Sequence, residues 1–205
     1  MPLTGGSIMA RISLTPRRTL GYRAVSWICR RRFGADIEPL AAASHNTRVL
    51  LTTSRMEQSV AKWNTADAGL KTLAVMATAA RVDCSWCMDF GYWESFRHGM
   101  DLRKLRDVPG WRESTVYTPA ERDVMEYAEA MTSTPPTVDD ALFDRLRRHL
   151  DEPRLVELTA IIAVENLRAR MNSALGITSQ GFKDRCDIAG PDPAAAAGAS
   201  GPAGP

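Results

Sequence analysis

Apolar residues recur at helical spacing along most of the chain. Side chains three and four positions apart share one face of an α-helix, and such a pattern indicates an amphipathic helix. No stretch of four or more residues alternates clearly between apolar and polar, so we find no hairpin or βαβ pattern. The chain is therefore predicted to be all-α. Typical helical sets are Leu20, Ala24, Trp27 and Ile28, and Val124, Tyr127, Ala128 and Met131.

Capping signals place the ends of these helices. The strongest is Thr118-Pro119-Ala120-Glu121, where an N-cap Thr, a Pro at the first helical position and a Glu complete a capping box. Glycines 34, 99 and 176 mark helix ends, because glycine readily adopts the left-handed conformation that follows a helix. The predicted helices cover about 20–33, 39–43, 49–63, 66–81, 84–98, 102–105, 119–131, 138–150 and 153–175.

Length and composition predict one globular domain between two irregular ends. We expect an extended N-terminal arm over residues 1–18, a helical domain over 19–188, and a disordered tail rich in Ala, Gly and Pro over 189–205. The net charge of +2 implies no strong attraction to nucleic acid or membranes. No signal peptide or membrane-length apolar run is visible, so we expect a cytoplasmic protein.

The most specific stretch is Asp83-Cys84-Ser85-Trp86-Cys87, which contains a CxxC pair. Cysteines three positions apart in a helix lie on one face and can form a disulfide with modest rearrangement. We expect Asp83 to cap the helix and Cys84 to lie in its first turn, where free N–H groups and the helix dipole stabilise a thiolate. We expect Cys84 and Cys87 to form a reversible disulfide and to be the catalytic residues.

A zinc site is the alternative for such a pair, because structural disulfides are rare in the cytoplasm. The chain lacks a second CxxC, and Cys29, Cys186 and His45 provide no recognised ligand spacing. We expect Cys29 to be a small buried hydrophobic residue. We therefore expect neither a metal nor a cofactor.

Several segments together resemble the carboxymuconolactone decarboxylase and alkylhydroperoxidase D superfamily, over most of residues 11–177. They are "ARISL", "LKTLAVMATAARVDC", "CSWC", "YTPAERDVMEYAEAMTSTPPTV" and "LVELTAIIAVENLRARMNSALGI". The resemblance implies a compact helical domain with the CxxC at the start of a central helix, assembled as a homotrimer, dimer or hexamer. It also implies reduction of hydroperoxides, with Cys87 as the attacking thiol and Cys84 as the exposed resolving thiol. The helix-end argument alone makes Cys84 the more acidic of the two.

The sequence departs from this family at the proton relay. Peroxidatic members carry a Glu twelve residues before the first cysteine and a His four residues after the second, and these positions are Thr72 and Gly91 here. Threonine cannot act as a general base near neutral pH. Gly91 removes an imidazole, and either opens a small cleft or lets two helices pack closely. Glu94 and His45 are candidate substitutes, although an exposed charge and a solvated loop histidine are the ordinary interpretations.

Other polar residues near the pair have ordinary structural interpretations. Asp89 is interpreted as a solvated helix residue, and Asn166, Arg170 and Asn172 as partners of backbone or subunit groups.

Three functions are considered for these residues. The first is a dithiol oxidoreductase that reduces a small hydroperoxide through a Cys84/Cys87 thiol–disulfide cycle and is recycled by an external thiol or dithiol. The second is a non-enzymatic or redox-sensing homo-oligomer that keeps the fold and the cysteine pair. The third, a lactone decarboxylase, has no support because the family histidine is missing. With the relay absent, we expect slow peroxidase turnover that rises with pH.

Overall fold

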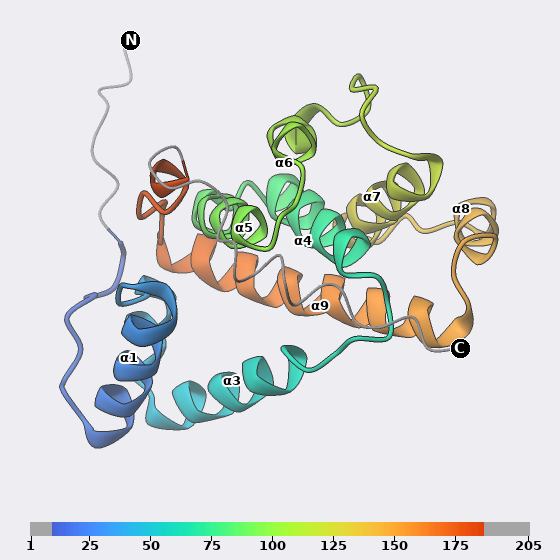
Figure 1. Ribbon diagram of the computed structural model, residues 1–205. Helices are drawn as coiled ribbons and strands as arrows, with labels where there is room; N and C mark the ends of the chain where they lie inside the picture. Colours follow the sequence, from blue (N-terminus) through green and yellow to red (C-terminus); the bar gives the residue numbers. More distant parts are fainter. Residues whose placement is uncertain (1–9, 187–205) are drawn as a thin grey trace, which may run out of the picture. The chain divides into compact units, whose positions relative to one another are not determined.

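The computed structural model describes residues 10–186, and every regular element in that range is a helix (Figure 1). This confirms the predicted all-α fold. The predicted tail over residues 189–205, and most of the predicted arm, lie outside the described residues. The α-helices are α1 (Leu20–Phe33), α2 (Glu38–Ala43), α3 (Thr47–Val60), α4 (Ala68–Val82), α5 (Ser85–Arg97), α6 (Leu102–Asp107), α7 (Pro119–Thr132), α8 (Asp140–Arg147) and α9 (Glu152–Leu175), with 3-10 helices η1 (Val108–Gly110) and η2 (Lys183–Arg185).

Packing contacts divide the described chain into two compact units. The first contains residues 10–63 and 171–178, and therefore α1, α2 and α3. The second contains residues 64–170 and 179–186, with α4 to α8 and most of α9. The predicted domain boundaries near residues 18 and 189 stay predictions.

The first helix of the first unit has the predicted caps but leaves its most apolar side chains exposed. Thr19 Oγ1 accepts a hydrogen bond from the Tyr22 N–H at 3.2 Å, and Gly34 ends the helix with a φ of 72°. Leu20 and Trp27 are 82% and 63% exposed. The buried side chains of α1 are Ser26 and Cys29, and burial raises the pKa of the Cys29 thiol to about 11.

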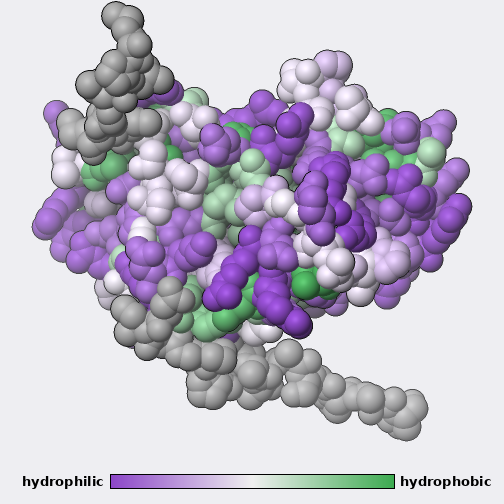
Figure 2. All heavy atoms as spheres, turned by 90° about the horizontal axis from the view of Figure 1, so that it is seen from above, coloured by the Kyte–Doolittle hydropathy of each residue, from purple (hydrophilic) through white to green (hydrophobic). Residues whose placement is uncertain are grey.

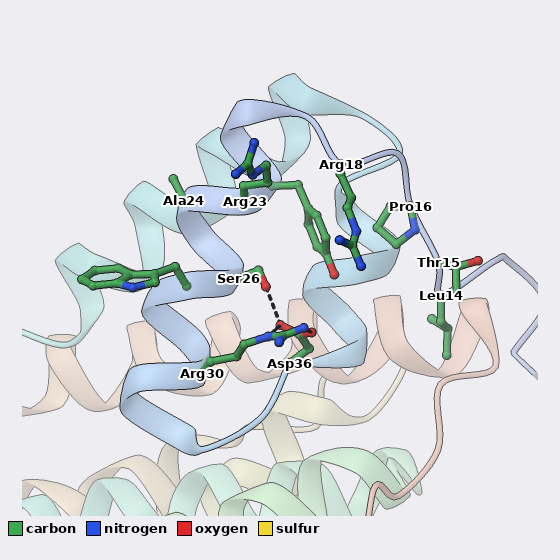
Figure 3. A pocket seen from close by; sticks show the side chains of 11 residues that line it. Leu14, Thr15, Pro16, Arg18, Arg23, Ala24, Ser26, Arg30 and Asp36 are labelled. Carbon is green, nitrogen blue, oxygen red and sulfur yellow. Dashed lines mark hydrogen bonds and ion pairs between the residues drawn. The ribbon is translucent and has the colours of Figure 1, made fainter.

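An open cavity of about 670 Å³ lies in the first unit (Figure 3). Arg18, Arg23 and Arg30 contribute to its wall. Arg30 forms an ion pair with Asp36, which also accepts a 2.5 Å hydrogen bond from Ser26 Oγ. The guanidinium of Arg30 therefore lowers the pKa of the Asp36 carboxyl.

Helix α4 is central to the second unit, as predicted. It packs against α5, α7 and η1. Helices α4, α5 and α7 lie together in Figure 1. Ala74, Ala77 and Ala79 on α4 are almost completely buried. Small side chains let the neighbouring helices approach closely, so the Ala-rich composition explains the central place of α4.

Two predicted helix starts in the second unit are wrong, for local reasons. Helix α4 begins at Ala68 and not at residue 66, because Asp67 caps it by accepting a hydrogen bond from the Leu70 N–H group. Helix α8 begins at Asp140 and not at residue 138, because Asp139 caps it by accepting a hydrogen bond from the Leu142 N–H group. The capping box of Thr118 and Glu121 at the start of α7 is confirmed.

Glu157 of α9 fixes the start of α4. Its carboxylate accepts hydrogen bonds from Lys71 Nζ at 2.7 Å and from the N–H groups of Thr65 and Ala66 at 2.9 and 3.2 Å. Burial by itself raises the pKa of Glu157, but these hydrogen bonds outweigh it and lower the pKa to about 2. On the face shown in Figure 2, hydrophilic residues cover most of the surface. The Glu157 side chain is only 10% exposed, so its carboxylate relies on these protein donors.

We predict that Glu157→Gln lowers the free energy of unfolding by about 2 kcal/mol at pH 7, because hydrogen bonds to a charged acceptor are lost. The folded-state pKa lies below the ordinary value of 4.5, so the stabilisation is complete above pH 4.5 and disappears as the pH falls toward 2. Urea unfolding at several pH values measures this. Val156→Ala, at a 70% exposed neighbour, is the control. Equal stability of Glu157→Gln and wild type at pH 7 would contradict the prediction.

Candidate active site

The CxxC pair lies where α4 turns directly into α5. Asp83 ends α4 in the left-handed conformation, with φ 59° and ψ 43°. Cys84 is then the N-cap of α5, and its Sγ accepts a hydrogen bond from the Cys87 N–H at 3.2 Å. The expectation that Asp83 caps this helix was wrong, because Asp83 is the C-cap of the preceding helix. A thiolate at Cys84 therefore has both a direct N–H donor and the positive helix end to stabilise it.

Cys84 and Cys87 are joined by a disulfide, with their Cα atoms 5.3 Å apart, so the predicted pairing is present. Cys84 is 2% exposed and Cys87 is 6% exposed. The expectation of an exposed resolving thiol at Cys84 was wrong, because capping of α5 turns the Cys84 sulfur inward. Charges near these buried sulfurs act with little screening by water.

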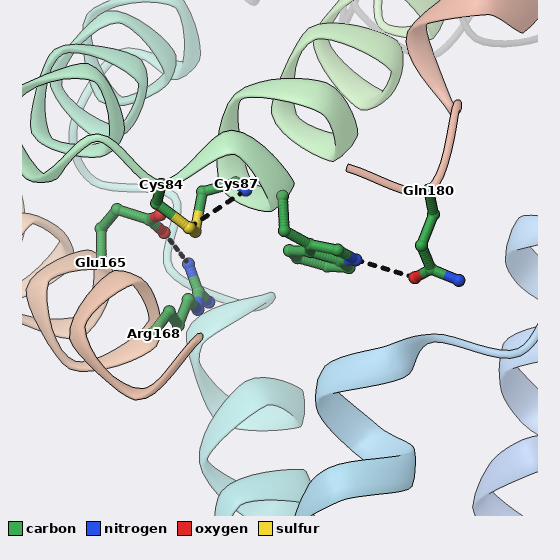
Figure 4. The surroundings of a disulfide bond; sticks show 6 residues. Cys84, Cys87, Glu165, Arg168 and Gln180 are labelled. Carbon is green, nitrogen blue, oxygen red and sulfur yellow. Dashed lines mark hydrogen bonds and ion pairs between the residues drawn. A yellow bond between two sulfur atoms is a disulfide. The ribbon is translucent and has the colours of Figure 1, made fainter. Parts of the chain in front are cut away.

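Two charged side chains of α9 lie in the surroundings of the disulfide (Figure 4). The Glu165 carboxylate points toward the cysteines, and Arg168 Nη1 donates to Glu165 Oε2 at 3.2 Å. The Glu165 side chain is 4% exposed and that of Arg168 is 27% exposed. Sequence analysis missed both residues. The available signal was that Glu165 occupies a position of the buried apolar stripe formed by Leu158, Ile161, Ile162 and Ala169.

An aromatic wall borders the other side of the CxxC segment. Trp86 stacks on Phe90 with ring centroids 4.9 Å apart, and Phe90 meets Phe182 edge-on at 5.2 Å. The Trp86 Nε1–H group donates to Gln180 Oε1 at 2.7 Å. The segment after α9 thus supplies one side of the surroundings of the cysteine pair (Figure 4).

Asp89 holds this segment against α5. Its carboxylate accepts hydrogen bonds from the N–H groups of Gln180, Phe182 and Lys183, at 2.9, 3.0 and 2.7 Å. Asp89 is 6% exposed, so its interpretation as a solvated residue was wrong. Three backbone donors replace the water that the carboxylate loses on burial.

The space beside Gly91 is occupied by Met76 of α4. A Cβ atom added at Gly91 would lie 2.6 Å from Met76 Sδ, closer than such atoms approach. Gly91 was predicted either to open a small cleft or to let two helices pack closely. The contact with Met76 shows that it lets α4 and α5 pack closely. A histidine at this position could enter only if Met76 moved, so the family relay cannot be restored by simple substitution.

The other sequence candidates have local partners. His45 Nε2 lies 2.7 Å from the Ser13 carbonyl oxygen within the first unit, and Glu94 is half-buried on α5. Asn166 Nδ2 donates to Thr132 Oγ1 at 2.9 Å, and Arg170 donates to the Thr132 carbonyl at 3.0 Å. The structural interpretation of Asn166 and Arg170 is confirmed.

Within residues 10–186, no group of three or more His, Cys, Asp or Glu side chains is arranged to hold a metal ion. No helix in this part of the chain combines the length and the apolar character needed to cross a membrane.

An all-helical fold with a CxxC pair at the start of a helix that packs on a central Ala-rich helix defines the alkylhydroperoxidase D-like class. Residues 47–130 match the model of the Carboxymuconolactone decarboxylase family. The protein YnjA of Escherichia coli (strain K12) is 35% identical over 161 residues, which cover 78% of this chain and 88% of YnjA. The chain belongs to the carboxymuconolactone decarboxylase family.

Solved structures share the fold at lower identity. The debrominase Bmp8 superposes with a TM-score of 0.73 at 19% identity, covering 84% of this chain and 94% of Bmp8. The alkylhydroperoxidase AhpD core of a peroxidase-related protein from Ralstonia eutropha JMP134 gives a TM-score of 0.73 at 17% identity, covering 86% and 94% of the two chains. These likenesses confirm the alkylhydroperoxidase D-like fold.

We predict that Asp89→Asn loosens the segment that follows α9. The amide keeps one acceptor but loses the charge, which should lower the free energy of unfolding by about 2 kcal/mol. Hydrogen exchange should become faster at the N–H groups of Gln180, Phe182 and Lys183. The matched control is Asp184→Asn, at an exposed position of the same segment. Unchanged exchange at all three amides would contradict the role assigned to Asp89.

Proposed function

We propose that this protein is a dithiol oxidoreductase that reduces small hydroperoxides through a cycle of Cys84 and Cys87. The observation that carries the proposal is the disulfide at the start of α5, with a charged pair of α9 in its surroundings. Membership of the carboxymuconolactone decarboxylase family supports it, as does the fold shared with a peroxidase-related protein. We take the cytoplasm as its location, because that compartment supplies dithiol reductants.

The cycle has three balanced steps. One cysteine thiolate attacks an oxygen of the hydroperoxide, so that an S–O bond forms, the O–O bond breaks and an alcohol leaves after protonation. The second thiol attacks the sulfenic sulfur, which forms the disulfide and releases water. An external thiol or dithiol then reduces the disulfide through a mixed disulfide and is itself oxidised.

The structure favours Cys84 as the more stabilised thiolate, because its sulfur accepts the Cys87 N–H group. The family resemblance favours Cys87 as the attacking residue. One equivalent of hydroperoxide distinguishes the two assignments. If Cys87 attacks, Cys84→Ser still forms a sulfenic acid, and if Cys84 attacks, Cys87→Ser does.

The chemistry near the pair limits the substrate class. Both cysteines are almost fully buried, and the aromatic side chains of Trp86 and Phe90 stack within the same helix. A small, partly apolar organic hydroperoxide suits this setting better than a bulky lipid hydroperoxide.

We predict that the reduced protein consumes cumene hydroperoxide with a dithiol reductant, releasing one alcohol per hydroperoxide. Cys84→Ser and Cys87→Ser should each abolish turnover, because the cycle needs both sulfurs. Cys29→Ser is the matched control and should keep wild-type turnover, since the Cys29 thiol is buried and its pKa is raised to about 11. Stoichiometric oxidation without turnover would contradict the enzyme and favour a redox sensor.

We further propose that the chain forms homo-oligomers, and we predict a mass above the 22.5 kDa of one chain. The supporting observation is that Leu20, Trp27 and Ile28 on α1 are 82%, 63% and 49% exposed, which is costly in water. Light scattering at micromolar concentration measures the mass. Trp27→Glu should shift the equilibrium toward monomer, whereas Arg23→Glu, at an exposed polar position of α1, is the control. A monomeric wild type would contradict this proposal.

A further inference from the structure

Glu165 is a buried carboxylate whose position needs an explanation. Only 3% of the residue is exposed, and glutamate is almost never so buried unless it is paired. Burial removes its water, and the Arg168 guanidinium, donating at 3.2 Å, offsets part of that cost. The ion pair with Arg168 therefore holds the Glu165 carboxylate inside the second unit.

The location of this charge is the second observation. Leu158, Ile161, Ile162 and Ala169 form the buried stripe of α9, and Glu165 occupies a position within that stripe. An apolar side chain would fill such a position at lower cost. The Glu165 carboxylate points instead toward Cys84 and Cys87 (Figure 4).

We infer that Glu165 is the proton acceptor and donor of the cysteine pair, in place of the relay that Thr72 and Gly91 cannot provide. The inference deepens the proposed function and rests on it for the identity of the oxidant. The titratable and charged groups around Glu165 in Figure 4 are Arg168 on α9 and the two cysteines at the start of α5. Asp83, the neighbour of Cys84 in sequence, is exposed.

The proton balance follows directly. The Glu165 carboxylate accepts the proton of the attacking thiol as the S–O bond forms and the O–O bond breaks. The resulting carboxylic acid returns this proton to the departing alkoxide, which leaves as an alcohol. In the second step Glu165 accepts the proton of the resolving thiol and gives it to the hydroxide that leaves the sulfenic sulfur, so water is released.

A purely electrostatic role and a proton-transfer role for Glu165 predict opposite changes in the rate of oxidation when the carboxylate is removed. A negative charge near a thiol disfavours the thiolate, so removing it would increase the thiolate fraction. Oxidation by hydroperoxide would then become faster in Glu165→Gln. A proton-transfer role predicts slower oxidation, because neither the thiol nor the alkoxide has a partner for its proton.

The experiment compares two reactions of the reduced protein between pH 5.5 and 9.5. Oxidation by cumene hydroperoxide needs a proton for the leaving alkoxide, whereas alkylation by iodoacetamide releases iodide and needs none. Glu165→Gln should oxidise about 10²-fold more slowly at pH 7, a typical effect of losing general acid–base catalysis. Its alkylation should slow less, because alkylation loses only the proton acceptor of the thiol and needs no proton donor. The oxidation rate should recover as the pH rises through about 8.5, where free thiols ionise.

Two further variants keep the inference falsifiable. Glu94→Gln removes a half-buried carboxylate from α5 and should behave as wild type in both reactions. If circular dichroism shows that Glu165→Gln does not fold, Glu165→Asp decides, because withdrawing the carboxylate by one methylene should slow oxidation at pH 7 about tenfold. Oxidation at the wild-type rate or faster in the folded Glu165 variant would overturn the inference.

Failure of the proposed function gives a different result. A wild-type protein that reacts with hydroperoxide no faster than free dithiothreitol would remove the hydroperoxide assignment alone. Glu165 is then tested by disulfide closure with glutathione disulfide, which also removes a proton from each thiol. Slower closure of Glu165→Gln at pH 7 would support the proton-transfer role, and equal or faster closure would overturn it.

Discussion

The chemistry of this protein depends on the junction at Asp83, where α4 ends and α5 begins without a connecting loop. A left-handed residue at this point lets the Asp83 N–H group bond to the end of α4 while Cys84 begins α5. Because α4 is the central helix of the second unit, the junction places Cys84 inside the protein. The N–H groups at the start of α5 then act on a sulfur that is shielded from water.

Close packing beside this junction occupies the position where the family carries its histidine. Met76 of α4 fills the space beside Gly91, and a side chain there would collide with its sulfur. An imidazole one turn beyond the cysteines would therefore require Met76 to shift. The Glu165 carboxylate of α9 points toward the pair.

Local interactions were predictable from the sequence, and contacts between distant segments were not. The capping box at Thr118 and the ends of α1 follow from neighbouring residues, and they were predicted correctly. The roles of Asp89 and Glu165 depend on contacts across about 80 to 90 residues, which the pattern around each residue does not contain. Glu165 also interrupts an apolar stripe, and a buried charge in such a stripe was the one available indication of a site.

The central claim is that a hydroperoxide closes one specific pair of thiols. Mass spectrometry of the reduced protein after one equivalent of cumene hydroperoxide tests it most directly. The account predicts that the peptide containing Cys84 and Cys87 loses two hydrogens while Cys29 and Cys186 stay reduced. A mixed disulfide with Cys29 or Cys186 as the main product, or a peptide that remains reduced, would contradict it.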